Sequence, residues 1–386
     1  MNLTYIIGNG FDLGLGLNTS YADFLDDFLS LDSDWAADGK GLERLRRMIS
    51  RDRLSWSDAE LAFAKLDFDR LEVCENELPC SNTFFPRSVR AQDTCNRFIR
   101  KLGAFLLKQQ QRLRSSVETF VQVQFHKALL FAPVIYSQSH RYSLNEWQSE
   151  ILKSHDPLNV NFITFNYTST LERLLGSMPL NCANDEISMS WGSPVGFNAP
   201  IHVHGKLDDV ASSLEKLIFG VSYRDQIEHP SLDLGAWVER RLLKPDRLDF
   251  ENRSTLDALS EVSSILRTSD LIVLFGVSLG ASDVKWWNGL GELMRKNGRL
   301  HLVYSDFNLI AQCPVAGFER LLQEHVRDKV LRAMEVGLET RKNIGNRILV
   351  MSQGPTYYPD DTERRNPIIG DPFCLTWFGR QLGIGD

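Results

Sequence analysis

The sequence predicts an α/β fold in which a large helical insertion interrupts a mainly parallel sheet after its first strand. The sheet is indicated by seven short apolar runs, which are nearly continuous rather than alternating, as is typical of strands covered by helices on both faces. In chain order these runs are residues 3–7, 160–165, 201–204, 217–219, 271–275, 300–304 and 347–351. Several of them end in Gly, Asn, Asp or Ser, as a turn from a strand into a helix requires.

The insertion is indicated by the long stretch between the first two runs, which carries almost no strand signal. A crossover between parallel strands needs only about a dozen residues. Apolar residues in this stretch recur at helical spacing, and they are Phe98, Leu102, Phe105, Leu106, Leu113, Val117, Phe120, Val121 and Phe125. We therefore assign residues 1–25 and 157–352 to the core and residues 26–156 to the insertion. Residues 353–386 are assigned to a tail that wraps over the surface, anchored by Phe373, Trp377 and Phe378.

Composition and charge exclude several classes of protein. Apolar residues make up 43% of the 386 positions, enough for a sizeable core, so a disordered or fibrous chain is excluded. The 43 Lys and Arg against 50 Asp and Glu give a net charge of −7, which argues against broad binding to nucleic acid or to anionic membranes. No apolar stretch approaches the ~20 residues of a membrane span, and the amino terminus lacks the basic region of a signal peptide.

The six cysteines indicate the compartment. They are scattered, with no C-x-x-C pair, whereas a disulfide framework belongs to short secreted chains and a structural zinc site needs closely spaced ligand pairs. We interpret them as reduced thiols and expect a cytoplasmic protein without a structural metal.

The first candidate site motif is GNGFDLGLG at residues 8–16, directly after the first strand. Glycines let a backbone approach a ligand closely, and the start of the next helix offers free N–H groups to a phosphate. The spacing differs from the G-x-G-x-x-G fingerprint of dinucleotide sites, and a tight turn into a helix would also explain it. Its position at the first strand of an α/β sheet favours nucleotide binding and a Rossmann-like core.

Two further motifs follow the next strands. TFNYT at residues 164–168 places Asn166 at a strand end, where it serves either as a helix cap or as a functional amide. HVHGK at residues 202–206 contains His202 and His204, which strand alternation would place on the same side. They are core imidazoles, metal ligands, or one structural and one catalytic group. Gly205 lets the chain turn away and leaves His204 at the carboxyl edge of the sheet, where ligands of α/β proteins bind.

The fourth motif is FGVSLGASD at residues 275–283, whose small, hydroxyl-bearing and acidic residues suit contacts with ribose and phosphate. A similar run at residues 218–222 is interpreted as shared strand-turn chemistry rather than as a repeat. Trp286 and Trp287, which follow, would suit a ligand-stacking or subunit surface, and core packing is the preferred interpretation because large aromatic side chains mostly fill cores. Because all four motifs lie at the carboxyl ends of strands, we expect them to meet in one crevice.

Together the motifs resemble the AbiH family of bacterial phage abortive-infection proteins. GNGFD at residues 8–12 and TSYADF at 19–24 are similar to the amino-terminal signature of that family. The later segments fit its pattern in the same order, and they are WSDAE at 56–60, TFNYT at 164–168, HVHG at 202–205, IFG at 218–220 and FGVS at 275–278. The resemblance runs from Gly8 to about Asp283.

AbiH proteins in turn look like distant relatives of sirtuins, whose fold is a Rossmann-like sheet that binds NAD. The sirtuin pattern falls here on Gly8 and Gly10, Asp23 and Phe24, Asn166, His204 and Gly205, and Gly276 and Ser278. By this resemblance Asn166 would orient water or ribose, His204 would act as the base, and Ser278 would hold the adenine-side ribose. Two departures stand out: there is no four-cysteine zinc module, which argues against protein deacylation, and Leu25 replaces the sirtuin arginine after Asp-Phe.

We therefore expect an antiphage effector that binds NAD, or a related nucleotide, and hydrolyses its N-glycosidic bond. Nicotinamide leaves as a neutral group from a cationic precursor, so the barrier lies in an oxocarbenium-like ribosyl centre and in water placement. The candidate catalytic residues are Asn166, His204, Asp12 and Asp23, and the candidate nucleotide-binding residues are Gly8, Asn9, Gly10, Phe11, Gly276, Ser278 and Asp283. Asp12 and Asp23 would stabilise the developing cation, although a helix N-terminus would also explain Asp23.

Two alternatives accompany this expectation. One is a metal-dependent hydrolase or nuclease that uses His202 and His204, with Asp208 and Asp209 close behind. The other is a non-catalytic sensor gated by a nucleotide. The expected partners are a nucleotide ligand and a phage or host trigger, without a membrane and without broad nucleic-acid binding; a homo-oligomer is a further alternative.

Overall fold

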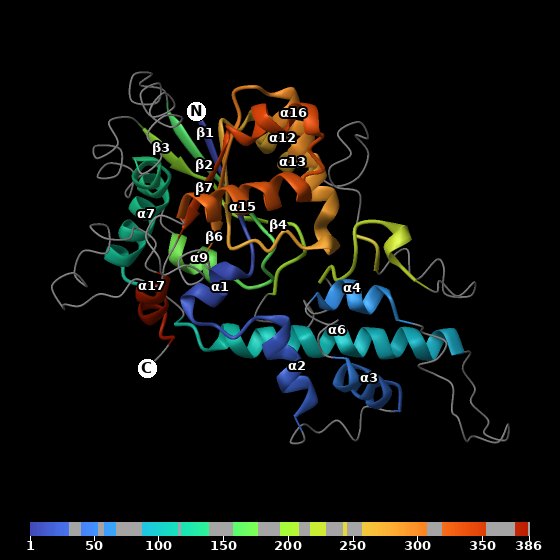
Figure 1. Ribbon diagram of the computed structural model, residues 1–386. Coiled ribbons are helices and arrows are strands. Elements are labelled where there is room, and N and C mark those ends of the chain that lie inside the picture. The colour runs from blue at the N-terminus through green and yellow to red at the C-terminus, as the bar shows by residue number, and fades with distance from the viewer. Residues whose placement is uncertain are drawn as a thin grey trace, which may run out of the picture.

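A parallel sheet forms the centre of the molecule (Figure 1). The computed structural model describes residues 1–30, 40–52, 58–66, 87–114, 117–138, 157–176, 194–207, 217–228, 242–244, 257–306, 319–352 and 375–384. Its strands are β1 (Asn2–Ile7), β2 (Leu158–Thr164), β3 (Val195–Phe197), β4 (Ile201–His202), β5 (Leu271–Phe275), β6 (His301–Asp306) and β7 (Ile348–Ser352). They are ordered β3-β2-β1-β5-β6-β7, β4 also pairs with β2, and every pairing between them is parallel.

This order confirms the predicted mainly parallel α/β fold. With the short β4 counted together with β3, it is the strand order of doubly wound nucleotide-binding sheets. β1 lies in the middle, with Leu3 between Val160 of β2 and Leu271 of β5. The chain therefore leaves β1 toward one side of the sheet and later returns on the other side through β5, which makes the β1–β5 boundary the topological switch point.

Side-chain alternation along β1 divides the core into two layers. Tyr5 and Ile7 contribute to one layer, with α1 (Gly10–Leu15), α7 (Thr119–Gln138), α9 (Thr170–Leu175) and α17 (Leu375–Gln381). Ile6 contributes to the other, with α12 (Asp257–Thr268), α13 (Val284–Lys296), α15 (Glu319–Ala333) and α16 (Leu338–Gly345). In Figure 1 the strands lie between α7 and α9 on the left and α12, α13 and α16 on the right. Trp286 and Trp287 are buried on α13, as core packing requires, and Trp287 also lines the cavity at the carboxyl ends of the strands.

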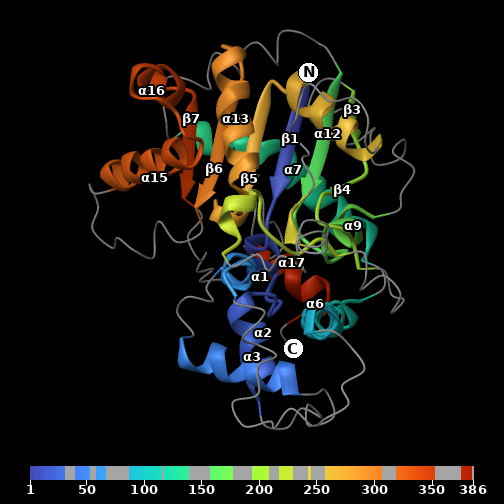
Figure 2. The same ribbon diagram turned by 90° about the vertical axis from the view of Figure 1, so that its right-hand side faces the viewer.

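A separate cluster of helices lies below the carboxyl ends of the strands in both views (Figures 1 and 2). It consists of α2 (Tyr21–Leu29), α3 (Lys40–Arg51), α4 (Ala59–Ala64) and α6 (Arg87–Gln111). Its core is rich in phenylalanine, and Phe98 packs there against Phe24, Phe28, Phe63 and Phe219. The predicted helical spacing is confirmed on α6 and α7, except that Phe120 is 53% exposed. α7 packs on the sheet rather than in this cluster, and the division at residues 26 and 156 stays a prediction.

Three sequence expectations differ from the structure. Residues 217–219 form no strand, and only Val221 makes an isolated bridge, to Leu243. The reason is the tight crossing of two segments: a Cβ on Gly220 would lie 2.0 Å from the Leu242 carbonyl oxygen. The strand expected over residues 201–204 ends at His202. β3 was not expected, because three residues with Gly196 at their centre make no apolar run.

The end of the chain supports the first helix. Residues 375–381 form α17, which packs on α1 so closely that a Cβ on Gly379 would lie 1.8 Å from the Leu15 carbonyl oxygen. Phe378 is fully buried there, whereas Phe373, the Trp377 side chain and most of the predicted tail lie outside the description. Cys95 is fully buried, and the other five cysteines lie outside the described residues. Within the described residues no helix is both long and apolar enough to cross a membrane.

Candidate functional site

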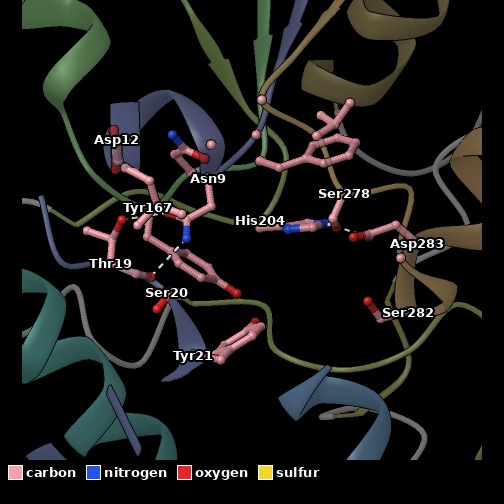
Figure 3. A pocket seen from close by; sticks show the side chains of 18 of the residues that line it. Asn9, Asp12, Thr19, Ser20, Tyr21, Tyr167, His204, Ser278, Ser282 and Asp283 are labelled. Atoms are coloured by element: carbon pink, nitrogen blue, oxygen red, sulfur yellow. Dashed lines mark hydrogen bonds and ion pairs between the residues drawn. The ribbon is translucent and has the colours of Figure 1, made fainter. Parts of the chain in front are cut away.

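A cavity of about 800 Å³ opens where the carboxyl ends of β1, β2 and β5 meet the helical cluster (Figure 3). It lies at the topological switch point of the sheet, the usual ligand position in doubly wound folds. The sheet side is lined by Gly8, Asn9, Gly10, Asp12, Asn166, His204, Gly276, Ser278 and Asp283, and the helical side by Tyr21, Asp58, Glu60, Leu102 and Leu106. The structure therefore brings together nine of the eleven predicted site residues, and Phe11 and Asp23 are not among those lining the cavity.

The glycine turns after β1 and β5 lie in direct backbone contact. The Gly8 N–H donates to the Phe275 carbonyl oxygen at 2.9 Å, and the Gly10 N–H donates to that of Gly276 at 2.8 Å. Gly276 has a φ of +67°, and a Cβ there would lie 2.5 Å from the Phe11 nitrogen. These glycines thus permit two turns to touch, a requirement separate from the expected close approach of a ligand.

Two predicted nucleotide-binding residues have structural partners in this turn. The Asn9 amide donates to the Thr19 carbonyl oxygen at 3.0 Å and accepts from the Thr19 hydroxyl at 2.7 Å, so it ties the turn to the start of α2. The Phe11 ring is buried and packs against Phe125 and Phe275. Phe11 therefore belongs to the core of the sheet, while Asn9 lines the cavity with its side chain already engaged.

Asp12 is a buried carboxylate in the cavity wall. Its two oxygens accept hydrogen bonds from the hydroxyls of Thr168 and Thr170, each at 2.5 Å. Burial raises the pKa of Asp12 to about 6, against the hydrogen bonds from Thr168, Thr170 and Asn166, which lower it. Asp12 is thus a group that changes charge close to physiological pH.

This shift predicts a pH dependence of stability. Because folding raises the Asp12 pKa from 3.8 to about 6, the folded protein binds this proton more tightly than the unfolded chain. The stabilising contribution is fully present below about pH 4 and is lost as the pH rises through about 6. As the pH rises through this range, we expect the free energy of unfolding of the wild type to fall relative to that of Asp12→Asn by on the order of 3 kcal/mol, because asparagine does not titrate. Urea denaturation at several pH values measures this difference. Equal pH slopes for the two proteins would contradict the assignment.

Asn166 is fixed by hydrogen bonds to its backbone N–H, its backbone carbonyl oxygen and its side chain. Its N–H donates to the Thr164 hydroxyl at 3.1 Å, its carbonyl oxygen lies 2.8 Å from His202 Nδ1, and its side chain hydrogen-bonds to Asp12. A carboxylate only accepts, so the amide nitrogen faces Asp12 and Oδ1 is left for the cavity. Oδ1 is buried and has no hydrogen-bond partner within the described part of the chain. A fixed buried acceptor at a cavity wall is suited to a ligand or water that donates a hydrogen bond.

His202 and His204, which were expected on the same side of one strand, bind different carboxylates. His202 Nε2 lies 2.7 Å from Glu172, and His204 Nε2 lies 3.2 Å from Asp283. Alternation fails because the strand ends at His202 and the chain bends toward Gly205, which has a φ of +89°. His202 is therefore a structural histidine that orients Asn166, while His204 lines the cavity and stacks on Phe165.

The basic partners of Glu172, His202 and Lys206, keep its carboxylate ionised. Burial raises the pKa of Glu172, but hydrogen bonds and charge from His202 and Lys206 outweigh it and lower the pKa to about 2.

Among the described residues, no group of three or more His, Cys, Asp and Glu side chains is arranged to hold a metal ion. Asp208 and Asp209, the other residues of the metal alternative, lie outside the described ranges.

His204 belongs to a chain of buried charges that the sequence did not reveal. Asp283 accepts from Lys244 at 2.8 Å, and Lys244 also donates to Glu60 at 2.7 Å. Burial raises the pKa of Asp283, but Lys244 and His204 outweigh it and lower the pKa. Burial raises the pKa of Glu60 to about 7 although Lys244 opposes it. Glu60 stands within the WSDAE segment, whereas no sequence signal marks Lys244.

Of the two remaining predicted residues, Ser278 lines the cavity and Asp23 caps a helix. Ser278 is exposed at the cavity, next to Leu279, whose φ of +55° is uncommon for a residue other than glycine. Asp23 forms a capping box at the start of α2: its carboxylate accepts from the Ser20 N–H, and its own N–H donates to the Ser20 hydroxyl. The carboxylate of Asp23 is therefore engaged in holding a helix end.

Comparison with known proteins adds one match. A family model described as "Bacteriophage abortive infection AbiH" matches residues 4–304. The matched range begins in β1, ends in β6, and includes every predicted site residue. Neither a curated protein nor a solved structure matches the chain significantly.

Proposed function

Because the chain belongs to the AbiH family of bacteriophage abortive infection proteins, we propose that it acts in this defence by binding NAD, or a related nucleotide, and hydrolysing its N-glycosidic bond. The family places the chain in abortive infection. The nucleotide and the reaction are our proposal, and they rest on the cavity at the switch point of the sheet. Its volume of about 800 Å³ lies within the ~300–1,000 Å³ of ligand pockets.

The observation that carries the proposal is the buried Oδ1 of Asn166 at the cavity wall. Hydrolysis at a ribosyl carbon needs a water or a ribose hydroxyl held in one orientation while positive charge develops on the sugar. Asn166 supplies a neutral acceptor for that hydrogen bond, and its backbone and amide are both fixed by neighbours. A preorganised acceptor costs no reorganisation during the reaction.

Two further features support this chemistry. His204 lines the cavity, and its Nε2 lies 3.2 Å from the Asp283 carboxylate, so its imidazole is placed to serve as the base that accepts a proton from the attacking water. Four acidic side chains, Asp12, Asp58, Glu60 and Asp283, line the cavity. Those that are ionised favour a cationic ribosyl centre over a neutral one.

The proposal is tested by incubating the purified protein with NAD and measuring free nicotinamide, with and without an extract of phage-infected cells. Asn166→Ala is expected to lower the rate by about 10²-fold, because it removes the acceptor that orients the nucleophile. Asn159→Ala is the matched control: this residue is exposed at the amino end of the same strand, and we expect it to leave the rate unchanged.

Absence of nicotinamide under both conditions would contradict the proposed reaction. Undiminished release from both Asn166→Ala and His204→Ala would contradict the proposed site.

A second candidate, a nucleotide-gated sensor without turnover, is favoured by one observation. Leu25, which stands where sirtuins carry an arginine, is buried in the helical cluster and does not contribute a cation to the cavity. Binding of ADP-ribose measured by calorimetry, without release of nicotinamide from NAD, would favour this candidate over hydrolysis.

A further inference from the structure

Three buried side chains and the partly buried Asp283 form a series of contacts from the helical cluster to the site. Glu60 lies on α4, Lys244 in the segment 242–244, Asp283 at the end of the 3₁₀ turn η5 (Ala281–Asp283), and His204 just beyond β4. The contacts run in series, from Glu60 Oε2 to Lys244 Nζ at 2.7 Å, from Nζ to Asp283 Oδ1 at 2.8 Å, and from Oδ1 to His204 Nε2 at 3.2 Å. The Asp283 side chain is the most exposed of the four, at 14%. We refer to these four residues as the charge chain.

The backbone around Lys244 is built to hold its ammonium group there. The Val221 N–H donates to the Leu242 carbonyl oxygen at 2.8 Å, and the Lys244 N–H donates to the Val221 carbonyl oxygen at 2.9 Å. The Gly220 N–H donates to the second oxygen of Glu60 at 3.3 Å. A side chain at position 220 would collide with Leu242, so the glycine permits this approach. Lys244 is therefore placed by main-chain hydrogen bonds as well as by its two carboxylates.

The charges of the chain do not cancel unless a proton is bound. Glu60 and Asp283 carry two negative charges, and Lys244 carries one positive charge. The buried group becomes neutral overall when the imidazole of His204 is protonated or when Glu60 is protonated. Uncompensated buried charge is costly, so the two alternatives compete for one proton. The other titratable groups that face the chain are Asp58, Tyr21 and Tyr167.

We propose that Lys244 and Glu60 are positioning residues, which hold the Asp283 carboxylate against His204 and thereby set the proton state that this imidazole presents to the cavity. The proposal rests on the proposed function for the role of His204 as a base. Glu60 lies on α4 in the helical cluster. The position of that cluster relative to the sheet therefore influences the proton affinity of His204.

The test is the pH titration of His204 in the full chain, followed by NMR of protein labelled at histidine. His204→Gln identifies its resonance among the eight histidines. Lys244→Met removes a positive charge and is expected to raise the titration midpoint of His204 by about one pH unit. Glu60→Gln removes a negative charge and is expected to lower it. The double variant retains only the pair of Asp283 and His204, and its midpoint is expected between the two single variants.

Lys65→Met is the control, since Lys65 pairs with Glu228 at the surface, and the midpoint of His204 should not change. Shifts of both single variants in the same direction, or no shift, would overturn the proposal, because loosened packing alone has no charge-dependent sign. If Lys244→Met does not fold, the direction of the Glu60→Gln shift decides. The titration needs no turnover: failure of the proposed function shows as missing nicotinamide from the wild type, and failure of this inference as an unchanged His204 midpoint.

Discussion

Gly276→Ala is expected to lower the free energy of unfolding by about 3 kcal/mol, measured by urea denaturation. Two costs combine at this position. The backbone φ of +67° is strained for any residue with a Cβ, and that Cβ would lie 2.5 Å from the Phe11 nitrogen and 2.7 Å from the Gly10 carbonyl carbon. Both obstructing atoms are backbone, so relief requires the turns after β1 and β5 to separate. That separation would also open the cavity wall and reduce nicotinamide release.

Gly298→Ala provides the matched comparison for Gly276. A Cβ at Gly298 would meet no atom within 4 Å, and the residue is not among the glycines of positive φ. The control should be neutral or slightly more stable, because alanine restricts the unfolded chain. Equal stability of the two variants would show that the contact between the turns is not tight in solution.

Phe98→Ala is expected to lower the free energy of unfolding by about 4 kcal/mol. The ring is fully buried, and its centroid lies 5.0 Å from that of Phe63 and 5.3 Å from those of Phe24 and Phe28. Truncation removes the ring that joins α2, α4 and α6, and leaves a void among rigid aromatic neighbours. Since α4 carries Glu60, nucleotide affinity should fall together with stability.

Phe120→Ala is the control for Phe98, since it removes the same atoms from a ring that is 53% exposed on α7. A change within ±0.5 kcal/mol is typical of such surface positions. If Phe98→Ala unfolded at the same denaturant concentration as Phe120→Ala, the aromatic cluster would contribute little to the stability of the fold.

The strands that were predicted well are those whose apolar runs reflect burial on both faces. Residues 271–275 were expected as a strand and form β5 with the same bounds. Residues 217–219 are equally apolar, yet they are buried against α4 and α6 rather than paired in the sheet. An apolar run records that a segment is buried, and it does not record which partner covers it. The meeting of the four motifs was predictable because the carboxyl ends of parallel strands share one edge.

The roles of single residues could be predicted where a local pattern explains them, and could not where they depend on contacts between distant segments. The Ser20 and Asp23 spacing is itself a capping-box pattern, so the local explanation of Asp23 was visible in the sequence. By contrast, Glu60 and Lys244 stand far apart in the chain, and their contact depends on how α4 meets the segment 242–244. No local pattern encodes such a pair. Asn166 was predicted as a site residue, but its fixation by Asp12 and His202 required the fold.

The contact between the two glycine turns has a consequence for the order in which the protein is made. β1 is synthesised before the helical cluster, whereas its neighbour β5 and the turn at Gly276 are synthesised only after that cluster. α17, which packs on α1, is synthesised later than β5. The cavity wall therefore cannot be completed until the turn at Gly276 has been synthesised and has met the turn after β1.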